Sequence, residues 1–106
     1  MTKLSNKTCQ PCEGGTEPML ESDINKMLDS IEGWSYELGK LRLNKVLKNH
    51  YQAMAFVNAV AWISHSENHH PDITVGYKDV RVEYWTHDIN GISENDFICA
   101  SKVNEL

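Results

Sequence analysis

Three of the five histidines of this chain lie in one short segment, as His69 and His70 before Pro71 and as His87 further along. Histidine is the side chain whose ordinary pKa lets it donate or accept a proton near neutral pH. With no thiol nearby, the cluster favours acid–base chemistry on a small molecule. A zinc site is the weaker alternative. Three histidines can bind catalytic zinc, but adjacent residues on an extended chain point apart and seldom converge on one ion.

A β-hairpin is expected to bring these histidines together. The residue before a proline avoids helical geometry, so His70 should be extended. Alternating apolar residues predict strands over 72–77 and 80–87, with a two-residue turn at their junction. The register that follows places His70 opposite His87 on one face of the sheet. His69 can join them only if the preceding loop bends its ring around the rim of the sheet.

The rest of the chain supplies the other elements of a small α+β fold. Apolar residues at helical spacing predict helices that begin near Glu21, at the N-cap Asn49 and at the N-cap Ser93, the last one closed by Asp96 in a capping box. A hairpin of two strands with a turn at Gly39 and Lys40 fits between the first two helices. The order α-β-β-α-β-β-α predicts a four-stranded antiparallel sheet with three helices packed on one face.

Length and composition indicate one domain, over 19–106, preceded by an irregular arm over 1–18 that is rich in proline and glycine. The net charge of −5 argues against nucleic acid as a partner. No apolar run reaches the ~18–20 residues of a membrane span, and the first residues do not read as a secretory signal. The cytoplasm is therefore the expected location. An odd cysteine count argues against a disulfide framework, so Cys9 and Cys12 are expected to be reduced thiols in a loose arm.

Several single residues have simpler interpretations. His50 lies in the first turn of a helix and is expected to be solvated, since the helix dipole disfavours a cation there. His65 lies in a last helical turn, where it either supports the site from behind or places charge at the helix end. Tyr77 is expected in the core. Trp85 is either part of the core or a stacking wall.

The spacing of these residues resembles the signature of the pterin-4a-carbinolamine dehydratases. The matching pattern is His65, three residues, His69-His70-Pro71, five residues, Tyr77, nine residues, His87, eight residues and Asp96. The likeness extends to Cys9-x-x-Cys12, to Gly33-Trp34 and to the segment 86–96, and it looks like the bacterial branch. It covers essentially the whole chain. His65 stands where an acidic residue is more usual in the family.

The resemblance implies a hydro-lyase that removes water from 4a-hydroxytetrahydrobiopterin to give quinonoid dihydropterin, recycling the cofactor of aromatic amino-acid hydroxylases. It implies that His69 and His87 form the acid–base pair and that His70 binds and orients the pterin. Which histidine is the acid stays open. The residues expected to border the substrate are Asn68, Pro71, Trp85, Asp88 and His65. No metal and no cofactor is expected, because the pterin is itself the substrate.

The resemblance also implies an oligomer, a homodimer or homotetramer. The alternative to an enzyme is a non-catalytic dimerisation or regulatory binding module on the same fold. Three titratable rings in one cleft favour the enzyme, because a scaffold has no need of them.

Overall fold

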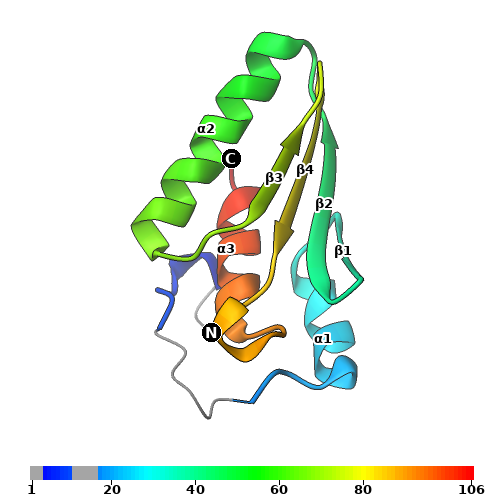
Figure 1. Ribbon diagram of the computed structural model, residues 1–106, viewed down its shortest axis with the longest axis vertical. Helices are drawn as coiled ribbons and strands as arrows, with labels where there is room; N and C mark the ends of the chain where they lie inside the picture. Colours follow the sequence, from blue (N-terminus) through cyan, green and yellow to red (C-terminus); the bar gives the residue numbers. More distant parts are fainter. Residues whose placement is uncertain (1–3, 11–16) are drawn as a thin grey trace.

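The computed structural model describes residues 4–10 and 17–106 (Figure 1). Its longer elements follow the expected order, and three short 3-10 helices (η) are added. In chain order they are η1 (Leu4–Asn6), α1 (Glu21–Met27), η2 (Leu28–Ser30), β1 (Trp34–Glu37), β2 (Lys40–Val46), α2 (His50–Glu67), β3 (Asp72–Val75), β4 (Asp79–Tyr84), η3 (His87–Ile89) and α3 (Glu94–Asn104). In the described part of the chain, no helix is long and apolar enough to cross a membrane.

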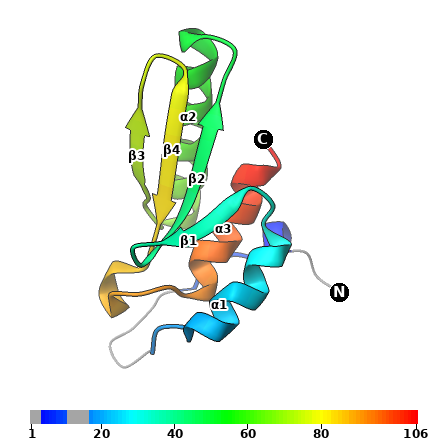
Figure 2. The same ribbon diagram turned by 90° about the vertical axis from the view of Figure 1, so that its right-hand side faces the viewer.

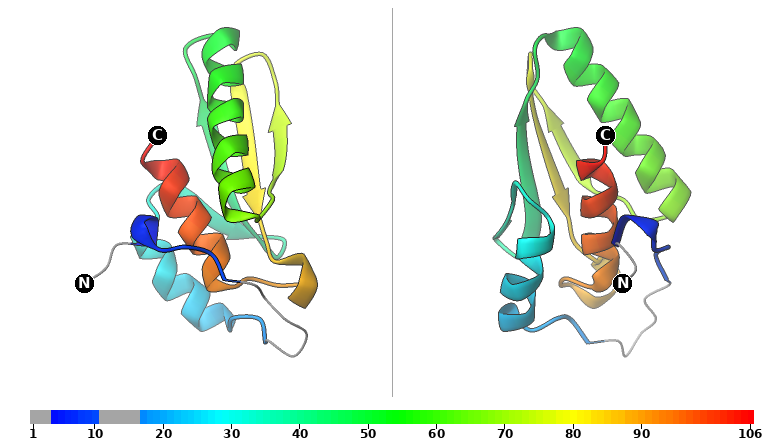
Figure 3. Two further views of the ribbon diagram at one scale, coloured as in Figure 1. Left: turned by 90° about the vertical axis from the view of Figure 1, so that its left-hand side faces the viewer. Right: turned by 180° about the vertical axis from the view of Figure 1, so that it is seen from behind.

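The four strands form one antiparallel sheet in the order β1-β2-β4-β3. Figures 2 and 3 show α2 and α3 on the same side of the sheet, with α1 beside α3 below β1. Leu41 pairs with Tyr84 and Leu43 with Val82 across the central strands, and all four are buried. The expected α+β fold with a four-stranded antiparallel sheet is confirmed.

One apolar core joins the sheet to all three helices. Ile24 of α1, Phe56 and Val60 of α2 and Phe97 of α3 belong to the same buried cluster as the central strands. Burying a side chain of this size stabilises a fold by about 1.5–3 kcal/mol. The core therefore holds α2 and α3 against the sheet. The histidine segment follows the end of α2, and the buried Asp96 lies in the first turn of α3.

The turn between β3 and β4 lies one residue earlier than predicted. Val75 pairs with Val80, and the Gly76 N–H donates to the carbonyl of Asp79 at 2.8 Å, so the two turn residues are Tyr77 and Lys78. Sliding one strand past the other by two residues leaves every side chain on the same face. The apolar alternation satisfies both registers, so it could not decide between them.

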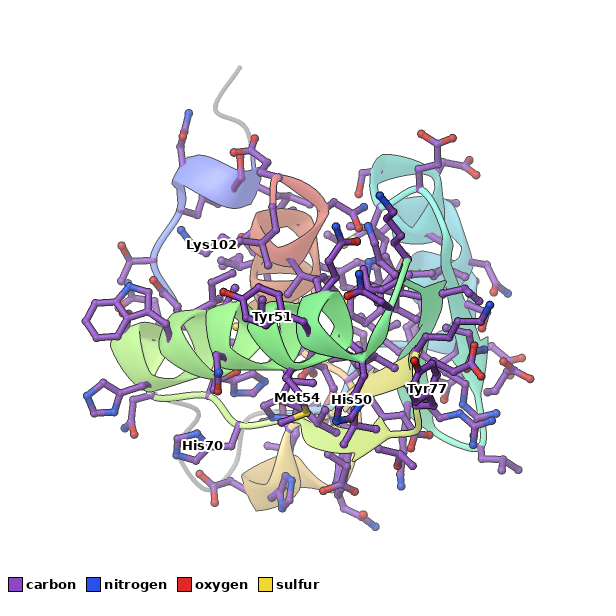
Figure 4. The ribbon with its side chains drawn as sticks, turned by 90° about the horizontal axis from the view of Figure 1, so that it is seen from above. His50, Tyr51, Met54, His70, Tyr77 and Lys102 are labelled. Carbon is purple, nitrogen blue, oxygen red and sulfur yellow. The ribbon has the colours of Figure 1, made fainter. Side chains whose placement is uncertain are left out.

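This shift overturns the predicted pairing of the histidines. Asp72 faces Glu83, β4 ends at Tyr84, and His87 lies beyond the strand in η3. His87 is therefore not the cross-strand neighbour of His70. Tyr77 is also not in the core: its side chain is exposed and stacks on His50 with ring centroids 5.7 Å apart (Figure 4).

The first hairpin turn is also one residue early. Glu37 pairs with Lys40, so the turn residues are Leu38 and Gly39 rather than Gly39 and Lys40. Both have positive φ, 53° and 78°. Two successive residues with positive φ make the turn whose twist suits a two-residue hairpin.

The N-terminal segment 4–10 begins with η1 and lies against α3. The Lys102 ammonium donates to the Ser5 carbonyl at 2.7 Å, and the Ser5 hydroxyl donates to Glu105 at 2.8 Å. Cys9 follows within the described segment. Cys12, the second cysteine of the predicted loose arm, lies outside the described residues.

Candidate active site

A cavity of about 420 Å³ lies where the end of α2, the end of β4, η3, the start of α3 and the segment 9–10 meet. It brings together most of the residues expected from the sequence. His69, His70, His87, Asn68, Trp85 and Asp88 all line it, whereas Pro71 and His65 do not. The volume is within the usual range for a small-molecule site.

The end of α2 turns His69 toward the interior. Asn68 caps the helix in the left-handed conformation, with φ 52° and ψ 43°. The N–H of His69 reaches back to the carbonyl of Ser64 at 3.0 Å, which closes the last turn. The chain thus reverses direction at one residue. This bend is the one that His69 needed in order to join the other histidines, and it leaves His70 exposed.

His69 is held by a buried carboxylate. Its Nε2 lies 2.5 Å from Oδ1 of Asp96, a side chain with no solvent exposure. The ring of His69 also stacks on that of Tyr84, with centroids 5.9 Å apart and planes 7° from parallel. An ionised carboxylate can only accept, so with Asp96 ionised the hydrogen of the neutral ring is on Nε2, and Nδ1 is the nitrogen that can exchange a proton.

Asp96 is fixed by two further hydrogen bonds through its other oxygen. Oδ2 accepts from the Thr86 hydroxyl at 2.8 Å and from the Ser93 N–H at 2.9 Å. The second bond is half of the predicted capping box, which is present at the start of α3. One carboxylate therefore caps a helix and orients a histidine, so the start of α3 and the site depend on each other.

Tyr84 forms the apolar backing of His69. Its hydroxyl lies 2.9 Å from that of Ser64, inside the core. Burial raises the pKa of the Tyr84 phenol well above its ordinary value. The ring is therefore a neutral platform at any pH at which histidine titrates.

His87 is positioned by Trp85 rather than by a strand. The two rings stack with centroids 4.1 Å apart and planes 12° from parallel. The Lys40 ammonium lies 4.3 Å from the centre of the same indole. His87 remains exposed on η3, so it reaches solvent while Trp85 restricts its orientation. Trp85 is half-buried and lines the cavity. It therefore lies between the two interpretations left open by the sequence, a core residue and a stacking wall.

Five further lining residues were missed by the sequence reasoning: Cys9, Gln10, Glu67, Thr86 and Asn95. Asp96 was noted as a helix cap and as part of the family signature, but not as a partner of His69. Two neighbouring polar residues, Asn95 and Asp96, sit in a helix whose other buried side chains are almost all apolar. These two polar residues were the available signal that the start of this helix belongs to a functional site. For Cys9 and Gln10 no signal existed, because only tertiary folding brings the arm to the cavity.

Two other histidines lie outside the cavity. His50 is exposed as expected, but its Nδ1 lies 2.7 Å from the Tyr77 carbonyl at the far end of α2. His65 is also exposed and has its ring near that of Trp62, with centroids 6.0 Å apart. Within residues 4–10 and 17–106, no group of three His, Cys, Asp or Glu side chains is arranged to hold a metal ion.

The fold is thus a small α+β domain, and its histidine-lined cavity, of the size usual for a small-molecule site, is the candidate active site of an enzyme. The chain matches the family described as Pterin 4 alpha carbinolamine dehydratase over residues 17–106. It therefore belongs to the pterin-4a-carbinolamine dehydratase family and is a hydro-lyase.

Curated relatives support the same assignment. The chain is 57% identical over 103 residues to a protein of Dechloromonas aromatica, covering 97% of this chain and 92% of that one. It is 57% identical over 104 residues to a protein of Nitrosospira multiformis, covering 97% and 91%. Both carry the provisional name pterin-4-alpha-carbinolamine dehydratase.

A solved structure shows the same fold. The transcriptional coactivator/pterin dehydratase of Brucella melitensis superposes with a TM-score of 0.79 at 28% identity. The match covers 84% of this chain and 97% of that one.

Proposed function

We propose that this chain dehydrates 4a-hydroxytetrahydropterin to quinonoid dihydropterin by histidine acid–base catalysis. The C4a–O bond breaks and the hydroxyl leaves as water after it accepts a proton. N5 loses its proton as the C4a=N5 bond forms, so the net change is the loss of one water. The observation that carries the proposal is one cavity lined by His69, His70 and His87, with His69 bonded to Asp96.

His69 is the best-ordered candidate for proton transfer. Asp96 fixes its tautomer and Tyr84 fixes its plane, so Nδ1 has a defined direction. A positioned acid or base accelerates a reaction by about 10²–10⁴-fold. His87 is the candidate for the opposite transfer, because an exposed ring can exchange its proton with water between turnovers. Either histidine could be the acid.

His70 is proposed to bind and orient the pterin. It is exposed at the cavity edge and has a hydrogen-bonding ring. Asn68, Trp85 and Asp88 are proposed to border the same substrate. Pro71 and His65 do not line the cavity, so any effect they have on binding is proposed to be indirect. The reaction as written needs no metal ion and no cofactor.

The test is the dehydration rate of the carbinolamine, measured against its spontaneous rate. His69→Ala and His87→Ala should each lower kcat by at least about 10²-fold, and a chelator should have no effect. A limb in the pH–rate profile near the histidine range is also expected. Full activity in both variants, or a flat profile from about pH 5 to 9, would contradict the mechanism. Activity lost to a chelator and restored by zinc would point to the metal alternative.

The cellular role is part of the same proposal. We propose that a separate reductase supplies two electrons to the quinonoid dihydropterin product, which then re-enters the tetrahydrobiopterin pool of an aromatic amino-acid hydroxylase in the cytoplasm. We also propose that the chain works as a homodimer or homotetramer. The Brucella relative is named both coactivator and dehydratase. A binding role would survive loss of the histidines, so an oligomer that forms normally in His69→Ala would separate the two functions.

A further inference from the structure

The segment of Cys9 and Gln10 forms part of the wall of the cavity, although it precedes the region matched by the family, residues 17–106. It is more than fifty residues from the histidines in sequence. A segment so distant stays at a cavity only if specific contacts hold it, because a free chain end loses conformational entropy on being ordered.

Asn95 holds this segment through both ends of its side-chain amide. Its Oδ1 accepts from the Gln10 N–H at 2.9 Å, and its Nδ2 donates to the Gln10 carbonyl at 2.5 Å. Two bonds to one peptide residue fix its orientation as well as its place. Asn95 is buried in the first turn of α3, next to Asp96.

Glu67 holds the preceding residue. Its Oε1 accepts from the Cys9 N–H at 2.8 Å, and its Oε2 lies 3.8 Å from the Lys102 ammonium. Lys102 in turn donates to the Ser5 carbonyl, and its side chain reaches from α3 toward η1 (Figure 4). The last residues of α2 and the whole length of α3 thus contribute to fixing the arm.

We propose that residues 9–10 are a substrate-contacting wall of the active site, and that Glu67 and Asn95 are positioning residues that hold this wall. The proposal rests on the proposed function, since it adds a binding element to the same cavity. It assigns to the arm a share of substrate affinity rather than of proton transfer, because no titratable group of the arm bonds to His69 or Asp96 among the described residues.

The first test is steady-state kinetics on full-length variants. Asn95→Ala should raise KM by about tenfold and change kcat by less than about twofold, the pattern of lost binding without lost chemistry. Glu67→Ala should do the same. Glu67→Gln keeps an oxygen that accepts from Cys9 and should recover most of the loss. Lys7→Ala removes an exposed ion pair between the arm and Glu94, and it serves as the matched control with unchanged KM.

Two kinetic outcomes overturn the proposal. One is a folded Asn95→Ala variant with the KM of the unchanged chain. The other is Glu67→Gln as damaging as Glu67→Ala, since the charge of Glu67 would then act on the substrate directly rather than through Cys9.

A second measurement needs no substitution. Iodoacetamide labels Cys9 in the unchanged chain, and tandem mass spectrometry separates it from Cys12. Bound 7,8-dihydropterin should slow the labelling of Cys9 severalfold. If fluorescence quenching shows that the dihydropterin binds to saturation but the labelling of Cys9 is not slowed, the proposed wall is overturned and the proposed function is not. No binding of the dihydropterin would overturn the proposed function and the wall with it.

An independent observation concerns the thiols of Cys9 and Cys99. Their sulfur atoms lie 3.7 Å apart, with Cys9 at the cavity and Cys99 fully buried. They are ninety residues apart in sequence, so the contact exists only in the folded chain. A disulfide needs the sulfurs to approach to about 2.05 Å, so the two side chains must move closer before the bond forms.

We infer that Cys9 and Cys99 form a reversible disulfide when the protein meets a low-molecular-weight disulfide. The Cys9 thiolate attacks that disulfide and releases one thiol, which leaves a mixed disulfide on Cys9. The Cys99 sulfur then attacks the Cys9 sulfur, and its proton passes to the departing sulfur, which leaves as the second thiol. Two protein thiols are oxidised and one small disulfide is reduced to two thiols. The bond would fasten the arm to α3 covalently.

The test is incubation of the full chain with oxidised glutathione followed by peptide mapping without reduction. The Cys9–Cys99 disulfide should form in the unchanged chain and in Cys12→Ser, and Cys99→Ser should stop at the mixed disulfide on Cys9. A disulfide between Cys9 and Cys12 in the unchanged chain, or none in Cys12→Ser, would overturn the assignment.

Discussion

Replacing Asp96 with asparagine tests whether the buried carboxylate sets the protonation of His69. The carboxylate accepts hydrogen bonds from His69, Thr86 and Ser93. An asparagine of the same shape has one accepting oxygen. If that oxygen keeps the bonds to Thr86 and Ser93, the amide NH₂ faces His69. The ring must then accept through Nε2 and carry its hydrogen on Nδ1, the reverse of the present tautomer.

The size of the effect follows from these contacts. A histidine in the wrong tautomer loses most of the benefit of its position, so kcat should fall by about 10²–10⁴-fold. The helix cap survives, and one charge-assisted bond is replaced by a neutral one, so the free energy of unfolding should fall by only about 1–3 kcal/mol. The Asp96→Asn variant should therefore lose most of its activity while it remains folded.

The assay measures carbinolamine dehydration and urea unfolding on the same preparation. Ser93→Ala is the matched control, because it removes a helix cap worth about 1 kcal/mol and leaves the bond from His69 to Asp96 in place. Its kcat should stay within a few-fold of the unchanged chain. A folded Asp96→Asn variant with kcat within about threefold of the unchanged chain would refute the reasoning.

Three further predictions concern stability. The hydrogen bond with Cys9 and burial raise the pKa of the Cys99 thiol. Above about pH 9 the unfolded chain therefore loses a proton that the folded chain keeps, and the free energy of unfolding should fall by about 1.4 kcal/mol per pH unit from this group. In urea unfolding measured from about pH 9 to 10.5, the free energy of unfolding should fall with pH less steeply in Cys99→Ala than in the unchanged chain, by that amount. Equal slopes in the two proteins would contradict the assigned cause. Asn49→Ala removes the side chain that caps α2 through Gln52 and should cost about 1 kcal/mol in urea unfolding; no change would mean that the cap is not needed. Gly91→Ala would place a Cβ 2.6 Å from Cβ of Pro18 and should cost about 1–3 kcal/mol, whereas an unchanged urea midpoint would show that Pro18 moves freely.

The fold was largely predictable because its elements are specified locally. Asn49 and Ser93 cap the helices that were predicted to start there. The apolar alternation marked the faces of the strands correctly. Both hairpin turns were nevertheless placed one residue too late, because a two-residue slide between strands keeps the faces and changes only which residues pair.

The amino-acid sequence alone was sufficient to indicate the histidine cluster and the hydro-lyase family, since these depend on residue types and their spacing. It could not show that His69 turns inward through the left-handed Asn68, or that Asp96 lies behind it. It also could not place Cys9 and Gln10 at the cavity. Such contacts join residues that only packing of the core brings together, and the free energy that selects them belongs to the whole fold rather than to any local segment.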